Sequence, residues 1–120
     1  MNSQHTSELA EWHAFNQETI EALIEDGSDA SKAHTIEYHF ASADFELLEK
    51  AAVDAFKAGF EVGDAEEFEL EDGEEVFCFD AVVERMLDVD LVNQDTDKLF
   101  AIAEKHGVDY DGWGTFFIEK

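Results

Sequence analysis

The sequence predicts a single α+β domain over 1–120, a two-layer sandwich with two helices on one face of a four-stranded antiparallel sheet. The spacing of apolar residues changes from a period of two to about 3.6 at Ser42, and again near Asn93, so strands and helices alternate. The 45% apolar content and the eleven Phe residues provide the core of one domain. The predicted order over 34–118 is β-α-β-β-α-β, which is the ferredoxin-like plan.

The stretch 34–60 is the centre of this prediction. Alternate residues from His34 to Phe40 are apolar or aromatic, which predicts a strand with one buried face. Apolar residues then recur at helical spacing, and we expect Ser42 to cap this helix and Gly59 to end it. A strand that runs directly into an amphipathic helix buries the two apolar faces together, so this stretch predicts one layer of sheet under one layer of helix.

The N-terminal segment 1–27 contains an additional predicted helix over 7–26. Ser7 is its expected cap, and Gly27 is its expected end. An interrupted apolar stripe along this helix predicts packing on the core. The sequence leaves open whether the helix covers the sheet face opposite the other two helices.

The next two strands form a predicted hairpin. Phe68 and Leu70 alternate with acidic residues before the turn, and 76–87 returns as the antiparallel partner. Asp72 and Gly73 suit a tight turn because both residue types tolerate positive φ.

The last helix and strand complete the predicted domain. Asn93 is the expected cap of a helix that runs through His106. In the strand that follows, Gly112 and Gly114 predict a bulge or a close backbone approach. We expect Trp113, between these two glycines, to be structural rather than functional.

The charge of the chain restricts its partners. There are 31 acidic residues against 7 Lys and Arg, a formal net charge of -24. Such a surface repels nucleic acid and anionic lipid but attracts basic protein segments and cations. We therefore expect no direct contact with nucleic acid or membrane. Solubility alone, or adaptation to salt, is the alternative explanation of the charge.

The sequence also predicts a cytoplasmic location. Cys78 is the single cysteine, so no disulfide can form within the chain. The N-terminus, MNSQHTSELAEWH, has neither the cationic start nor the apolar run of a signal peptide. No apolar stretch in the sequence is long enough to cross a membrane.

The motifs give no indication of an enzyme, a metal site or a cofactor. The chain has no phosphate-binding loop, dinucleotide fingerprint, HExxH spacing or zinc-cysteine cluster. The sequence around Gly112 does not match a calcium-binding EF-hand loop. Gly107 and Ile118 would occupy the first and last ligand positions of that loop, and neither has a side chain that can bind calcium. Glu37 and His39 share a strand face and suit an acid-base pair, although two exposed polar residues are the simpler interpretation. A small metal-binding or hydrolytic domain remains an alternative.

The predicted open face of the sheet is the candidate site, and it suits a protein partner. If the strands pack as predicted, acidic residues converge there: Glu37, Glu67, Glu69, Glu71 and Asp80. Acidic residues around a partly apolar centre suit a basic peptide that also carries apolar residues.

Three segments, 20–62, 68–82 and 103–117, closely resemble the RraB family of bacterial protein inhibitors of ribonuclease E. The most specific part is YDGWG at 110–114. The resemblance implies a cytoplasmic, non-catalytic regulator. Members bind the C-terminal scaffold region of ribonuclease E, outside its catalytic half, restrain its cleavage of RNA and so change transcript abundance.

The resemblance and the charge lead to the same partner. Scaffold regions of this kind are rich in arginine, and a strongly acidic domain is their complement. An alternative is that the chain mimics nucleic acid and plugs an RNA-binding channel in the catalytic half. Binding to that isolated half would favour this alternative.

Overall fold

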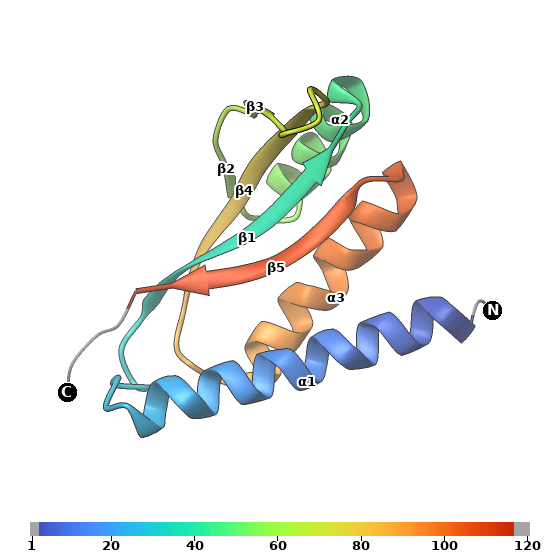
Figure 1. Ribbon diagram of the computed structural model, residues 1–120. Helices are drawn as coiled ribbons and strands as arrows, with labels where there is room; N and C mark the ends of the chain where they lie inside the picture. The colour runs from blue at the N-terminus through green and yellow to red at the C-terminus, as the bar shows by residue number, and fades with distance from the viewer. Residues whose placement is uncertain (1–2, 117–120) are drawn as a thin grey trace.

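A computed structural model describes residues 3–116, with side chains from residue 8 onward. These residues form three helices and one five-stranded antiparallel sheet (Figure 1). The elements are, in order, α1 (Ser3–Glu25), β1 (His34–Ser42), α2 (Phe45–Lys57), β2 (Glu61–Val62), β3 (Glu66–Glu69), β4 (Glu75–Arg85), α3 (Val89–His106) and β5 (Asp109–Thr115). The predicted α+β class is confirmed, but the sheet has five strands rather than four. Residues 117–118 of the predicted last strand lie outside the described residues.

The extra strand arises because the predicted second strand is broken. The sheet order is β2-β4-β1-β5, and β3 also pairs with β4. β2 lies opposite Ala81 and Val82, whereas β3 lies opposite the residues from Glu75 to Cys78. Since β1 occupies the other side of β4, the two short strands share one edge of the sheet. The break falls at residues 63–65.

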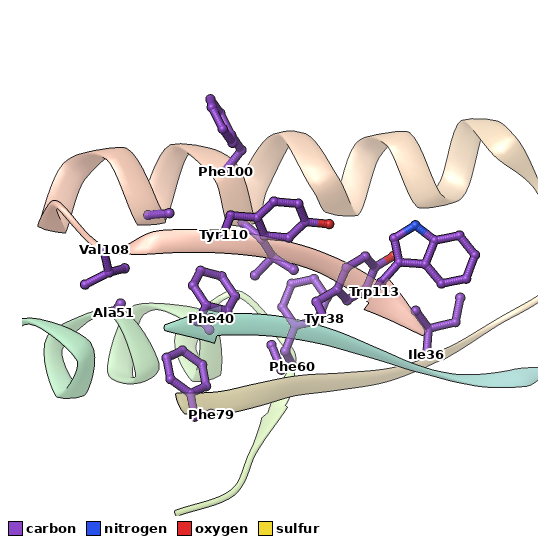
Figure 2. Packing of buried hydrophobic residues seen from close by; sticks show 14 of the residues in the cluster. Ile36, Tyr38, Phe40, Ala51, Phe60, Phe79, Phe100, Val108, Tyr110 and Trp113 are labelled. Atoms are coloured by element: carbon purple, nitrogen blue, oxygen red, sulfur yellow. The ribbon is translucent and has the colours of Figure 1, made fainter. Parts of the chain in front are cut away.

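The core lies between the sheet and the helices α2 and α3. Every second residue from His34 to Phe40 is buried, as the alternation in the sequence predicts. Figure 2 shows the rings of Phe40 and Phe79 stacked, with centroids 4.8 Å apart. Leu48 of α2 and Leu99 of α3 are both fully buried in the same cluster. The two helices therefore cover one face of the sheet.

The predicted N-terminal caps of α2 and α3 are wrong by a few residues. Asp44 caps α2 because its carboxylate accepts hydrogen bonds from two backbone amides of the first turn, while the Ser42 hydroxyl accepts one from Asp44 itself. Asp88 caps α3 in the same way. α3 therefore begins before Asn93, which lies within the helix. A carboxylate can accept from both free amides at a helix start, and this explains why Asp takes the position in each case.

α1 is longer than predicted and lies along α3 (Figure 1). It already includes Ser3, so Ser7 is not its cap. Gly27 follows the helix with a φ of 105°, as expected for a glycine that ends one.

Asn16 joins α1 to the rest of the fold and is fully buried. Its amide nitrogen donates to Asn93 Oδ1 at 2.9 Å and to Thr96 Oγ1 at 3.0 Å. Its amide oxygen accepts from Trp113 Nε1 at 2.6 Å. These three hydrogen bonds explain why a polar residue interrupts the apolar stripe of α1.

A second buried polar group holds α3 over the sheet. The Asp95 side chain is 3% exposed. It accepts hydrogen bonds from the Tyr38 hydroxyl at 3.0 Å and from Arg85 Nε at 3.1 Å. Burial, together with the negative charge of Asp95, raises the pKa of Tyr38 well above its usual value, so the hydroxyl stays a donor.

β5 is irregular at Gly112. The register between β5 and β1 shifts between Tyr38 and Phe40. Gly112 has a φ of 93°, and a Cβ on it would lie 3.0 Å from the Trp12 ring of α1. The predicted bulge and close approach are therefore confirmed at this glycine. Trp113 is 6% exposed, as expected for a structural residue.

Candidate partner-binding surface

The open sheet face is the side of β1, β4 and β5 that points away from α2 and α3. Glu37 and His39 of β1 lie on it and are partly exposed. They lie opposite Val82 and Asp80 of β4. Since α1 packs along α3, no helix within residues 3–116 covers this face. The alternative that the N-terminal helix covers it is therefore excluded for the described part of the chain.

The hairpin turn decides which acidic residues reach the open sheet face. The Leu70 amide donates to the Glu74 carbonyl at 2.7 Å, so residues 71–73 form a three-residue loop. A two-residue turn at Asp72 and Gly73 would instead pair residues 71 and 74. Only Gly73 of this loop has a positive φ, at 88°. The longer loop shifts the register by one residue, and a shift of one residue turns every side chain of the strand to the other face.

Glu66 and Phe68 consequently lie on the open sheet face. Glu66 is opposite Cys78, and Phe68 is opposite Val76. Residues directly opposite each other in an antiparallel pair share a face. Phe68 is 48% exposed, although its alternation with acidic residues suggested a buried position.

The five predicted site residues therefore fall into three places. Glu37 and Asp80 lie together on the open sheet face, as predicted. Glu67 and Glu69 lie on the reverse side of the hairpin, and their predicted place on the open face is wrong because of the loop length. Glu71 lies in the loop itself. Contact of any of these residues with a partner stays a prediction.

A pocket lies on the open sheet face where β2, β3 and β4 meet. It has a volume of about 520 Å³. We call it the sheet pocket; its lining residues are Gly63, Asp64, Glu66, Phe68, Cys78, Phe79, Asp80 and Val82. Its lining includes three carboxylates and no basic residue. The arrangement suits a cation that carries an apolar portion.

Cys78 lies in the lining of this pocket. Burial raises the pKa of the thiol, and nearby Asp111, Asp80 and Glu66 raise it further. Those three residues come from β5, β4 and β3, so the negative charge that acts on the thiol comes from three strands. The thiol is held in its protonated form, which is a poor nucleophile.

His39 pairs with Asp80 rather than with Glu37. His39 Nδ1 lies 2.7 Å from Asp80 Oδ1, and the two side chains are 44% and 40% exposed. A Cβ on Gly114 would lie 3.8 Å from the His39 ring. The alternative of an acid-base pair between Glu37 and His39 is therefore not supported, because the His39 ring pairs with Asp80 of the neighbouring strand. Among the described residues, no group of three or more His, Cys, Asp or Glu side chains is placed to hold a metal ion.

Sequence reasoning missed four residues of this surface: Asp64, Glu66, Phe68 and Asp111. A three-residue loop, with Gly at its last position, would have placed Glu66 and Phe68 correctly. Asp64 lies in the strand break and Asp111 lies next to the bulge at Gly112, and alternation alone cannot locate either feature. None of the described helices has the length and apolar content to cross a membrane.

Known proteins resemble this chain over almost its whole length. A family model described as "Regulator of ribonuclease activity B" matches residues 13–115. A protein of that name from Pseudoalteromonas atlantica is 75% identical over 115 residues, covering 96% of this chain and 98% of the relative. One from Alteromonas mediterranea is 69% identical over 110 residues, which cover 92% of this chain and 83% of that relative. One from Aeromonas salmonicida is 54% identical over 112 residues, which cover 93% of this chain and 97% of that relative. The chain therefore belongs to the RraB family, a family of regulators of ribonuclease activity rather than of catalysts.

Proposed function

We propose that this protein binds ribonuclease E in the cytoplasm, through its acidic surface, and restrains the cleavage of RNA. The observation that carries the proposal is the lining of the sheet pocket, which combines the carboxylates of Asp64, Glu66 and Asp80 with apolar side chains. Such a surface complements a basic protein segment in both charge and apolar character. The names of the relatives, as regulators of ribonuclease activity, support a ribonuclease as the partner.

Within this proposal the partner segment is the arginine-rich scaffold region of ribonuclease E. Glu37 and Asp80 belong to the proposed contact surface on the open sheet face. Glu67, Glu69 and Glu71 lie on the reverse side and at the tip of the same hairpin. We assign those three residues to long-range attraction, which raises the association rate without requiring direct contact.

We also infer that the domain folds as one cooperative unit on the ferredoxin-like plan. If β2 and β3 count as one interrupted strand, the order across the sheet is second, third, first and fourth strand. This inference supports a rigid sheet face as the binding platform. Coincident unfolding transitions measured by fluorescence and circular dichroism are expected for such a unit.

The direct test is a pull-down with full-length ribonuclease E and its two separated halves. We expect the full-length enzyme and the scaffold half to bind, and the catalytic half not to bind. Binding to the catalytic half alone would instead support the nucleic-acid mimic. Binding to neither half nor to the full-length enzyme would reject the proposal.

A second test separates the hairpin charges from the net charge. Changing Glu67, Glu69 and Glu71 together to Lys should strongly slow association with the scaffold fragment at low salt. The difference should shrink as salt shortens the Debye length from ~10 Å at 0.1 M to ~3 Å at 1 M. The matched control makes the same charge change on exposed residues of α1, at Glu18, Glu21 and Glu25. Equal slowing by both variants in stopped-flow measurements would show that only net charge matters.

A further inference from the structure

We propose that the sheet pocket holds one arginine side chain of a basic peptide, and that this contact sets the lifetime of the complex. The inference rests on the proposed function, because it assigns a specific anchor within the acidic surface. It concerns the pocket where β2, β3 and β4 meet, rather than the charge of the whole domain.

The pocket lies at a gap in the edge of the sheet. β2 pairs with Ala81 and Val82, and β3 begins opposite Cys78. Neither Phe79 nor Asp80 therefore has a paired residue on that side. This gap is two residues long, and residues 63–65 of the chain itself connect the strands on either side of it. The gap therefore suits a single side chain rather than a whole strand of a partner.

The lining of the pocket selects a side chain with an apolar stem and a cationic end. Val82 and the exposed ring of Phe68 provide apolar surface for the stem. Asp64, Glu66 and Asp80 supply the carboxylates. Neither Asp64 nor Glu66 forms a salt bridge with a described residue, whereas Asp80 already contacts His39 at 2.7 Å. The available negative charge is therefore centred on Asp64 and Glu66.

Arginine meets these requirements better than lysine. Its planar guanidinium directs several N–H donors outward and can bind carboxylates on different walls of the pocket at once. The same plane can stack on an aromatic ring, and Phe68 is 48% exposed. Lysine carries a more strongly hydrated point charge, which loses more on leaving water.

The test compares two acidic residues at opposite ends of β3, Glu66 and Glu69, whose side chains lie on opposite faces of the sheet. Glu66→Gln removes one carboxylate from the pocket, whereas Glu69→Gln removes the same charge from the reverse side of the hairpin. The probe is a short synthetic peptide of arginine and apolar residues, measured by surface plasmon resonance. Glu66→Gln should raise the dissociation rate about tenfold, because a hydrogen bond to a charged group is lost. Glu69→Gln should leave the dissociation rate unchanged and only slow association.

A lysine version of the same peptide provides the second readout. The wild-type domain should hold the arginine peptide longer than the lysine peptide, and Glu66→Gln should reduce that difference. In amide spectra, the arginine peptide should shift the Gly63 and Cys78 signals more than those of α1. The inference that the sheet pocket holds arginine would be overturned by equal dissociation rates for the Glu66→Gln and Glu69→Gln variants. It would also be overturned if the peptide caused no shift of the Gly63 and Cys78 signals.

These outcomes separate the pocket from the proposed function. If full-length ribonuclease E binds both variants as tightly as the wild type, the pocket inference fails and the proposed function stands. If ribonuclease E does not bind the wild-type domain, but Glu66→Gln still selectively weakens the arginine peptide, the proposed function fails and the pocket stands.

Discussion

Replacing Asn16 with Ala should strongly destabilise the domain. Asn16 is the fully buried residue that connects α1 to α3 and β5. The substitution removes an acceptor at 2.6 Å from the Trp113 indole nitrogen and a donor to Asn93 and Thr96. A buried donor that loses its partner costs about 1–3 kcal/mol. With the two further lost contacts, we expect the free energy of unfolding to fall by about 2–4 kcal/mol.

Urea titration followed by Trp fluorescence measures this loss, and a thermal melt should show a lower Tm by about 10 °C. Gln17→Ala is the matched control, because Gln17 is the next residue, is exposed, and bonds only to Glu21 among described side chains. It should change stability by less than about 0.5 kcal/mol.

A double-mutant cycle tests the physical reason. Trp113→Phe removes the indole N–H, so Asn16→Ala should cost less in that background than in the wild type. If Asn16→Ala costs no more than Gln17→Ala, the buried hydrogen bonds do not hold α1 in place. Equal costs of Asn16→Ala in both backgrounds would show that the Trp113 contact is not part of its contribution.

Two further predictions concern the bulge and the hairpin. Gly112→Ala should destabilise the domain by about 2 kcal/mol, because φ is 93° and the new Cβ would lie 3.0 Å from the Trp12 ring. Gly63→Ala, with open space around it, should have little effect in the same urea titration, and equal costs would contradict the steric reason. Glu67→Gln should stabilise the domain at neutral pH, because a hydrogen bond and the negative charge from Glu75 raise the pKa of Glu67. The raised pKa means that the folded state binds the proton more tightly, so stability falls as pH rises through the carboxyl range. The gain should therefore disappear in melts below the ordinary Glu pKa of about 4.3, and an equal gain at both pH values would exclude the carboxylate pair as its cause.

Local patterns in the sequence determined most of the elements. The alternation from His34 to Phe40 predicted β1 and its buried face, because side chains of a strand alternate between two sides. Gly112 marked the bulge, because few other residues tolerate its backbone conformation. The charge of -24 predicts a basic partner, and this prediction needs no knowledge of the fold because net charge does not depend on how the chain folds.

The candidate site could be predicted only in part. Glu37 and Asp80 were placed correctly, because alternation along each of the two long strands shows which side chains point away from the core. Glu67 and Glu69 were placed on the wrong face, and Glu66 was missed, because the loop has three residues. The pairing energy of a short exposed strand such as β3 differs little between the two registers, so its alternation alone could not decide between them.

Long-range polar contacts were decided by the tertiary structure alone. Asn16 and Trp113 are 97 positions apart, and Tyr38 and Asp95 are 57 apart. In the sequence, Asn16 and Asp95 only interrupt apolar stripes, and a polar residue in a helix is normally exposed. They are buried because hydrogen-bond partners from distant elements meet them, which offsets the cost of removing them from water. Periodicity thus determined which faces are apolar, whereas the packing of helices against the sheet determined which polar residues those faces could contain.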